Sequence, residues 1–196
     1  GNIKKLIKDL EYWQISRISK MTCNRFGEVL YPLLTDVFKW FKQEALKENR
    51  KMILDIEIKF DKEMSFSSTT LTDLMLTQIT KFNLMESVRL RTFYPRVFWR
   101  LKKRFKKNTI ILLTDKRIWF WPFYAKLMGA KIVAPRINRV NKSVMFFSRL
   151  LGLKVFVWGA NEIFDFKKLL DLKVDAITTD YPGKLRSFLE KMCYTR

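Results

Sequence analysis

The feature that most constrains the fold is a regular alternation of strand-like and helix-like segments from residue 52 onward. Short apolar runs rich in β-branched residues predict strands at residues 52–58, 88–93, 109–114, 131–134, 154–158 and 175–179. Between them, apolar residues recur at the spacing of an amphipathic helix. Alternating strands and helices favour parallel strands with helices packed outside, either in a (β/α) barrel or in an open doubly wound sheet.

The rest of the chain is consistent with one domain of this kind. The first fifty residues have a helical pattern, and one predicted helix has an apolar face made by Leu34, Val37, Phe38, Phe41 and Ala45. The chain has no linker or low-complexity tract, and its 48% hydrophobic residues are enough for one substantial core. We therefore predict a single α/β domain over residues 1–196.

The chain is strongly basic, with 39 Lys and Arg against 19 Asp and Glu and a formal net charge of +20. This charge favours anionic partners, namely phospholipid headgroups, phosphate esters or nucleic acid, without choosing among them. The longest apolar stretches, such as residues 118–125, are far shorter than the roughly 20 residues of a membrane-spanning helix. The two cysteines match no metal or redox spacing and indicate free thiols, so we expect a cytoplasmic or peripherally membrane-associated protein.

One predicted strand carries charges on one face only. Alternation over residues 54–59 places Asp55, Glu57 and Lys59 on one side and apolar residues on the other. In a barrel the outward face is covered by helices, so the charged face would point into the interior, close to where barrel active sites form. A carboxylate there could bind a divalent cation, and the lysine a phosphate oxygen. The alternative is an edge strand whose polar face is solvated.

Several motifs occur in the order found in the glycerophosphodiester phosphodiesterase family. The run MILDIEIK at residues 52–59 resembles that family's strand with a Glu and a Lys two residues apart. YPLLTDV at 31–37 is similar to its helix start, RTFYP at 91–95 to its Ser-Phe-x-Pro strand end, and VWGAN at 157–161 to its Trp-Thr-x-Asn motif. VDAITTDYP at 174–182 resembles its closing motif most specifically. The resemblance covers residues 27–196 and leans toward the animal membrane-associated, lysophospholipase D-like branch.

The resemblance implies a partial TIM-type (β/α)8 barrel that lacks its first strands. It implies metal-dependent hydrolysis of glycerophosphodiesters or lysophospholipids to an alcohol and a glycerol phosphate, with Mg²⁺ or Ca²⁺ as cofactor. By the same resemblance Glu57 is a metal ligand, Lys59 stabilises the phosphate charge, and Trp158 and Phe93 line the substrate pocket. Without the family, the favoured interpretation of Trp158 is a core-packing indole. Asn161 is predicted to cap the following helix, with substrate binding as the alternative.

The family's first motifs, His-Arg-Gly, Glu-x-Asp and His-Asp, do not occur in this sequence, which contains no histidine. Histidine is the usual residue for acid–base catalysis near neutral pH. Glu57 would be the one inherited metal ligand, too few to hold a hard cation tightly. We therefore expect an N-terminally incomplete copy of the domain that is inactive alone and binds metal weakly or not at all.

A second hypothesis is a catalytically dead module that binds anionic membranes or phospholipids. Residues 117–126 hold five aromatics flanked by cations and could insert at a membrane interface, although burial against the barrel is the favoured explanation. The basic run at residues 102–107 is typical of a solvated helix face. Nucleic-acid binding rests on charge alone, since no recognition motif is present, and is the weakest of the hypotheses.

Overall fold

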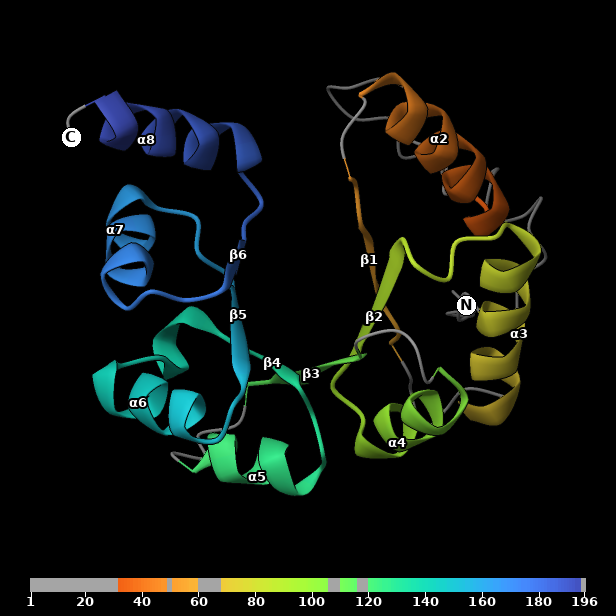
Figure 1. The fold of residues 1–196 in the computed structure, drawn as a ribbon, viewed down its shortest axis with the longest axis horizontal. Helices are drawn as coiled ribbons and strands as arrows, with labels where there is room; N and C mark the ends of the chain where they lie inside the picture. Colours follow the sequence, from red (N-terminus) through yellow and green to blue (C-terminus); the bar gives the residue numbers. More distant parts are fainter. Residues whose placement is uncertain (1–31, 49–50, 60–67, 106–109, 116–119, 195–196) are drawn as a thin grey trace, which may run out of the picture. The chain divides into compact units, whose positions relative to one another are not determined.

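The structure, a computed structural model, describes residues 32–48, 51–59, 68–105, 110–115 and 120–194 (Figure 1). The chain forms two compact units. The first comprises residues 1–54 and 60–87, and the second comprises residues 55–59 and 88–196. The assignment of residues 1–196 to one domain stays a prediction. None of the helices within the described ranges is both long and apolar enough to cross a membrane.

In the first unit, the described helices are α2 (Leu34–Lys47) and α3 (Ser68–Lys81). The apolar face predicted for α2 turns inward, because Phe38 and Phe41 are buried. The Phe38 ring meets the Phe82 ring edge-on with centroids 5.4 Å apart, and Lys42 Nζ donates to the Phe82 carbonyl at 3.4 Å. On the exposed side, a hydrogen bond to Glu44 raises the pKa of the Lys47 ammonium.

The second unit is built on a parallel sheet whose strands follow one another in chain order. The strands are β1 (Leu54–Glu57), which belongs to this unit from Asp55 onward, β2 (Val88–Thr92), β3 (Ile110–Thr114), β4 (Ile132–Pro135), β5 (Lys154–Trp158) and β6 (Ala176–Thr178). Each lies within a segment predicted as a strand or differs from it by one residue, so the predicted alternation is confirmed. The sequential order belongs to the (β/α) barrel rather than to a doubly wound sheet, whose strand order reverses.

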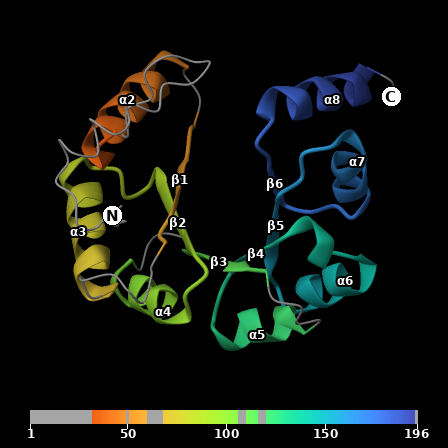
Figure 2. The ribbon, with the colours of Figure 1, turned by 180° about the vertical axis from the view of Figure 1, so that it is seen from behind.

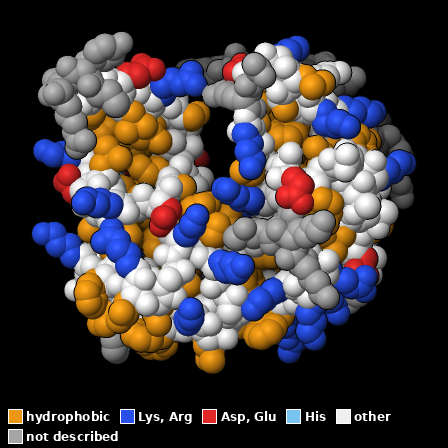
Figure 3. All heavy atoms as spheres, viewed as in Figure 1, with side chains coloured by type: hydrophobic (Ala, Val, Ile, Leu, Met, Phe, Trp, Pro, Cys, Tyr) orange, Lys and Arg blue, Asp and Glu red, His pale blue; other side chains and the backbone are white. Residues whose placement is uncertain are grey.

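Helices follow these strands and lie outside them, as Figures 1 and 2 show. They are α4 (Pro95–Arg104), α5 (Trp121–Leu127), α6 (Lys142–Leu150), α7 (Ile163–Asp171) and α8 (Pro182–Tyr194), with a 3-10 turn, η2 (Ile137–Arg139), ahead of α6. Their inner faces supply buried residues, such as Phe98 and Leu101 from α4 and Phe166 from α7. Over α5 and α6, at the lower left of Figure 3, hydrophobic side chains also reach the surface.

Contacts between distant strands show that the sheet of the second unit is curled. Arg91 Nη1 on β2 donates to Thr178 Oγ1 on β6 at 3.5 Å, although β3, β4 and β5 lie between them. Strands are spaced about 4.8 Å apart, so a flat sheet would separate these two by about 19 Å, beyond the combined reach of an arginine and a threonine. The face that bears Arg91 and Thr178 is therefore concave, as in a barrel interior.

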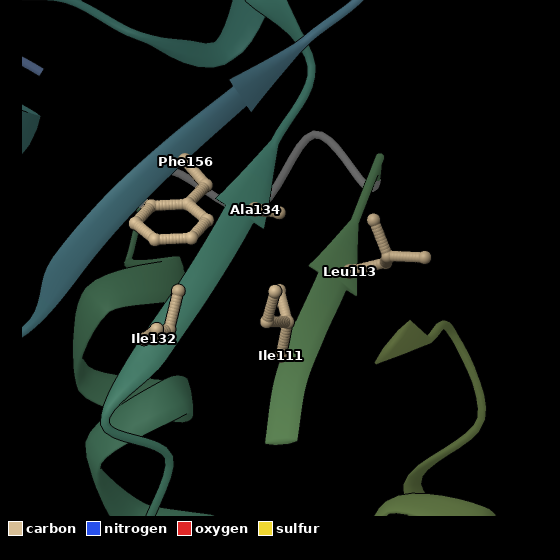
Figure 4. Packing of buried hydrophobic residues seen from close by; sticks show 5 residues of the cluster. All are labelled: Ile111, Leu113, Ile132, Ala134 and Phe156. Atoms are coloured by element: carbon tan, nitrogen blue, oxygen red, sulfur yellow. The ribbon is translucent and has the colours of Figure 1, made fainter. Parts of the chain in front are cut away.

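The centre of the concave face is an apolar cluster formed by alternate residues of β3, β4 and β5. Its buried members are Ile111, Leu113, Ile132, Ala134 and Phe156, which Figure 4 shows side by side on one face. Register explains the match, because Ile111 pairs with Ile132 and Leu113 with Ala134. All five residues of β3 are buried, since helices cover its other face.

Replacing Ile111, which is fully buried, with alanine should lower the free energy of unfolding by about 2–5 kcal/mol, through lost apolar transfer and an unfilled cavity. Chemical denaturation followed by circular dichroism measures this change. Leu127→Ala is the control, because Leu127 is 82% exposed and should change stability by no more than about 0.5 kcal/mol. Equal effects of the two substitutions would contradict the packed cluster.

Candidate functional site

The charged residues of β1 lie on one face of the strand. Asp55 and Glu57 are more accessible than Leu54 and Ile56, which are half-buried. Lys59, two residues beyond Glu57, is exposed, and Ile58 between them is buried, with its N–H donating to the Arg91 carbonyl at 2.8 Å. The predicted division of β1 into a charged face and an apolar face is confirmed.

Asp55 is held by Arg91, an arginine to which the sequence motifs assign no role. Arg91 Nε donates to Asp55 Oδ1 at 2.7 Å, and Arg91 Nη2 donates to Asp55 Oδ2. The third nitrogen of the guanidinium reaches Thr178, so one arginine connects β1, β2 and β6. Such a fork-shaped pairing occupies both carboxylate oxygens. Asp55 therefore lies on the concave face, which favours the barrel-interior alternative for the charged side of β1.

Trp158 and Phe93, two of the predicted site residues, are in contact at the carboxyl ends of β5 and β2. Their rings meet edge-on, with centroids 5.8 Å apart and planes at 85°. The Trp158 indole N–H donates to the Ala134 carbonyl at 3.0 Å, and the ring packs against the apolar cluster while staying partly exposed. One edge of Trp158 is thus anchored in the core, and the rest of its ring forms with Phe93 a partly exposed aromatic wall at the carboxyl ends of these strands.

Arg136, at the end of β4, covers the Trp158 ring. Its guanidinium carbon lies 5.5 Å from the ring centroid, and Nη1 is 3.9 Å from Asp115 Oδ2. Gly159, which stands where the family motif has threonine, has φ of 77°, and a Cβ there would lie 3.8 Å from Arg136 Cγ. A β-branched residue would be strained at this φ. The sequence departs from the family motif where the backbone requires glycine.

Asn161 joins the loop after β5 to the loop after β6. Its Nδ2 donates to Asp180 Oδ2 at 2.7 Å, while its Oδ1 accepts from the Asp180 N–H at 3.0 Å and from Thr179 Oγ1 at 3.1 Å. The expectation that Asn161 caps α7 is wrong, because Glu162 is the N-cap and forms a capping box with Asp165. Asn161 instead fixes the two loops at the carboxyl edge of the sheet.

A groove of about 790 Å³ opens beside the Arg91–Asp55 pair. Besides these two residues it is lined by the end of β6 and by α8, with Thr178, Thr179, Leu185, Arg186 and Leu189 among the lining residues. Its volume lies in the range of small-molecule sites, about 300–1,000 Å³. None of the four predicted site residues, all of them described by the structure, lines this groove. The Trp158–Phe93 wall and the groove are separate features of the concave side.

The carboxylates in the described ranges do not fit a divalent metal centre. There, no group of three or more His, Cys, Asp or Glu side chains could hold a metal ion. A hard cation prefers about six oxygen ligands, several of them charged. Glu57 is exposed, and Asp55 on the same face already accepts two hydrogen bonds from Arg91. Within the described part of the chain, no side-chain hydrogen bond or ion pair involves Glu57 or Lys59.

The glycerophosphoryl diester phosphodiesterase family profile matches residues 1–184. Because this match spans most of the chain, the protein belongs to that family. The predicted resemblance is confirmed, and the partial (β/α)8 fold agrees with it.

Solved structures share the fold at low sequence identity. A glycerophosphodiester phosphodiesterase from Parabacteroides distasonis has a TM-score of 0.71 and 18% identity over 90% of this chain and 71% of that chain. A phosphodiesterase from Oleispira antarctica, in complex with the product sn-glycerol-3-phosphate, has a TM-score of 0.64 and 15% identity over 81% of this chain and 61% of that one. A structure from Silicibacter pomeroyi, with a TM-score of 0.75 and 18% identity, is matched over 85% of this chain and 58% of its own.

Among curated proteins, the rat (Rattus norvegicus) lysophospholipase D GDPD1 is 42% identical over 41 residues, which are 21% of this chain and 13% of that protein. The human (Homo sapiens) protein of the same name is 45% identical over 38 residues, which are 19% of this chain and 12% of that protein. The matched segments therefore span about an eighth of these relatives.

The Arg91–Asp55 pair should contribute measurably to stability, because the two side chains are only 12% and 26% exposed. In a double-mutant cycle with Arg91→Leu and Asp55→Leu, we expect a coupling energy of about 1–3 kcal/mol in urea unfolding. The matched control is Lys184 with Glu162, whose side chains are 37% and 57% exposed and whose coupling should stay below about 1 kcal/mol. A coupling for Arg91 and Asp55 no larger than the control would show that the pair is not a structural tie.

Proposed function

We propose that this chain is part of a hydrolase of phosphoric diesters, with glycerophosphodiesters or lysophospholipids as substrates and an alcohol and a glycerol phosphate as products, in lipid metabolism. The observation that carries the proposal is the family match over residues 1–184. The product complex of the Oleispira phosphodiesterase and the lysophospholipase D relatives support the choice of substrate class.

The residue roles in this proposal follow the positions of the side chains on the second unit. Lys59 lies beyond the carboxyl end of β1, is exposed and stabilises the negative charge of a phosphate. Trp158 and Phe93, in ring contact at the ends of β5 and β2, form an apolar wall for the glycerol or headgroup part of the substrate. Parallel strands bring their carboxyl ends to the same edge of a sheet, which is where (β/α) barrels place their active sites.

Glu57 is the metal ligand in this assignment, but the donors around it in the described ranges do not complete a site. The sequence contains no histidine, and therefore no side chain whose unperturbed pKa falls near neutral pH. We accordingly assign to the described residues the holding of phosphate and headgroup, and we expect no turnover by this chain alone.

The first test is hydrolysis of glycerophosphocholine and lysophosphatidylcholine by the purified chain, with Mg²⁺ or Ca²⁺ or with a chelator, beside Glu57→Ala. We expect no release of choline above the chelator blank. Product that depends on both the metal and Glu57 would show that the site works without histidine and that the expected inactivity is wrong.

The second test is binding of sn-glycerol-3-phosphate, measured by titration calorimetry in the presence of chelator. Lys59→Ala should weaken binding about tenfold to a hundredfold, the effect of losing a charge-assisted hydrogen bond. Lys184→Ala is the control, because Lys184 is occupied by Glu162 and the Asn161 carbonyl. Equal affinities of the wild type and Lys59→Ala would remove Lys59 from the phosphate site.

A further inference from the structure

The positive charge of the chain is concentrated in one segment. Between Asp115 and Glu162 the sequence contains no Asp or Glu and nine Lys or Arg. This segment alone holds nearly half of the formal net charge of +20. A segment whose charged residues are all positive attracts negatively charged partners and repels other copies of the same chain.

Within this segment, α5 and α6 have apolar residues on their outward faces as well as on their inward faces. On α6, Val144 and Met145 are buried, while Phe146, Phe147 and Leu150 are exposed. On α5, Trp121 and Ala125 are buried, while Phe123 and Leu127 are exposed. The outward residues follow the spacing of three or four residues that defines a single helix face.

We call these outward residues the α5–α6 patch: Phe123, Leu127, Phe146, Phe147 and Leu150. The Phe147 ring contacts both the Phe123 ring and the Phe146 ring, with centroids 5.5 Å apart in each pair. Lys126 Nζ donates to the Leu151 carbonyl at 2.9 Å and so ties α5 to the end of α6. In Figure 3 hydrophobic side chains gather over both helices, with Lys and Arg side chains nearby.

The patch differs from the aromatic segment predicted to insert at a membrane. Trp121, in the middle of that segment, is 1% exposed, and its indole N–H donates to the Arg139 carbonyl at 3.3 Å. Trp119 lies outside the described residues. Phe120 and Phe123 are exposed, but the most exposed large apolar side chains here are Leu127 at 82%, Leu150 at 71% and Phe146 at 62%.

We propose that the α5–α6 patch docks onto the surface of an anionic lipid bilayer. Its leucine and phenylalanine side chains enter the boundary between headgroups and acyl chains, and the surrounding Lys and Arg side chains face the lipid phosphates. Helices with apolar residues on one side and cations beside them lie at such interfaces. A second copy of the chain fits less well, because two surfaces of this charge repel each other. Nucleic acid also fits less well, because the side chains of the patch have no hydrogen-bonding groups with which to contact bases or phosphates. This inference does not rest on hydrolysis.

The test is co-sedimentation of the full chain with phosphatidylcholine vesicles that contain or lack phosphatidylserine. The wild type should bind the anionic vesicles, bind the neutral ones at least about tenfold more weakly, and lose binding as salt rises. The combined variant Leu127→Ser, Phe146→Ser, Leu150→Ser keeps the net charge and should bind anionic vesicles at least about tenfold more weakly, because apolar area no longer leaves water.

The matched control is Ile163→Ser with Phe164→Ser on α7, which removes side chains that are 54% and 71% exposed outside the patch and also leaves the charge unchanged. It should bind like the wild type. All variants should keep the wild-type circular dichroism and thermal midpoint, because the substituted side chains are exposed.

Three results would overturn the proposal. One is equal vesicle binding by the patch variant and the wild type, which would mean that charge alone drives binding. Another is a fall in sedimentation coefficient for the patch variant, which would assign the patch to a second copy of the chain. The third is duplex DNA binding that weakens with the patch variant while vesicle binding does not, which would assign the patch to nucleic acid.

Discussion

The organisation of the second unit depends on the need of parallel strands to be covered on both faces. β3 and β4 are buried along their whole lengths, by helices on one side and by the apolar cluster on the other. A sheet covered in this way leaves the ends of its strands accessible, and in (β/α) barrels the active site lies at the carboxyl ends. Side chains far apart in sequence, such as Phe93 and Trp158, therefore come into contact there.

Because the sheet is curled, polar side chains on its concave face lie close together and have little access to water. On the concave face the residues of β3 to β5 are mainly apolar, whereas β1, β2 and β6 contribute Asp55, Arg91 and Thr178. A guanidinium with little access to water is costly unless it is paired, and Arg91 is satisfied by the two oxygens of Asp55 and by Thr178. The same pairing occupies the carboxylate closest in sequence to Glu57, so a structural requirement competes with metal binding on this strand.

Much of the second unit could be predicted from the sequence because its period-two and helical patterns are strong. Each of the six strands was predicted, since each is a short β-rich run between helical patterns. The rings of Phe93 and Trp158 are in contact, while the substrate pocket that the motifs implied for them stays a prediction. Arg91 was missed because a single arginine on a strand gives no signal until the curl brings β6 close to β2. Asn161 was expected to cap α7, but the neighbouring Glu162 is the N-cap. The hydrogen-bond partners of Asn161 lie in the loop after β6, which local sequence does not place beside it.

The carboxyl edge of the sheet and the α5–α6 patch are connected by a short stretch of chain. Arg136 covers Trp158 at the end of β4, and only η2 (Ile137–Arg139) and two further residues separate it from the start of α6. Arg139 in that turn donates from Nε to the Asp115 carbonyl at the end of β3, and its own carbonyl accepts from the Trp121 indole of α5. Arg139 thus links the end of β4, where Arg136 covers Trp158, to both α5 and α6. If the patch rests on a lipid surface, the orientation of α5 and α6 on that surface also fixes the orientation of the Trp158 wall, because no flexible linker intervenes between them.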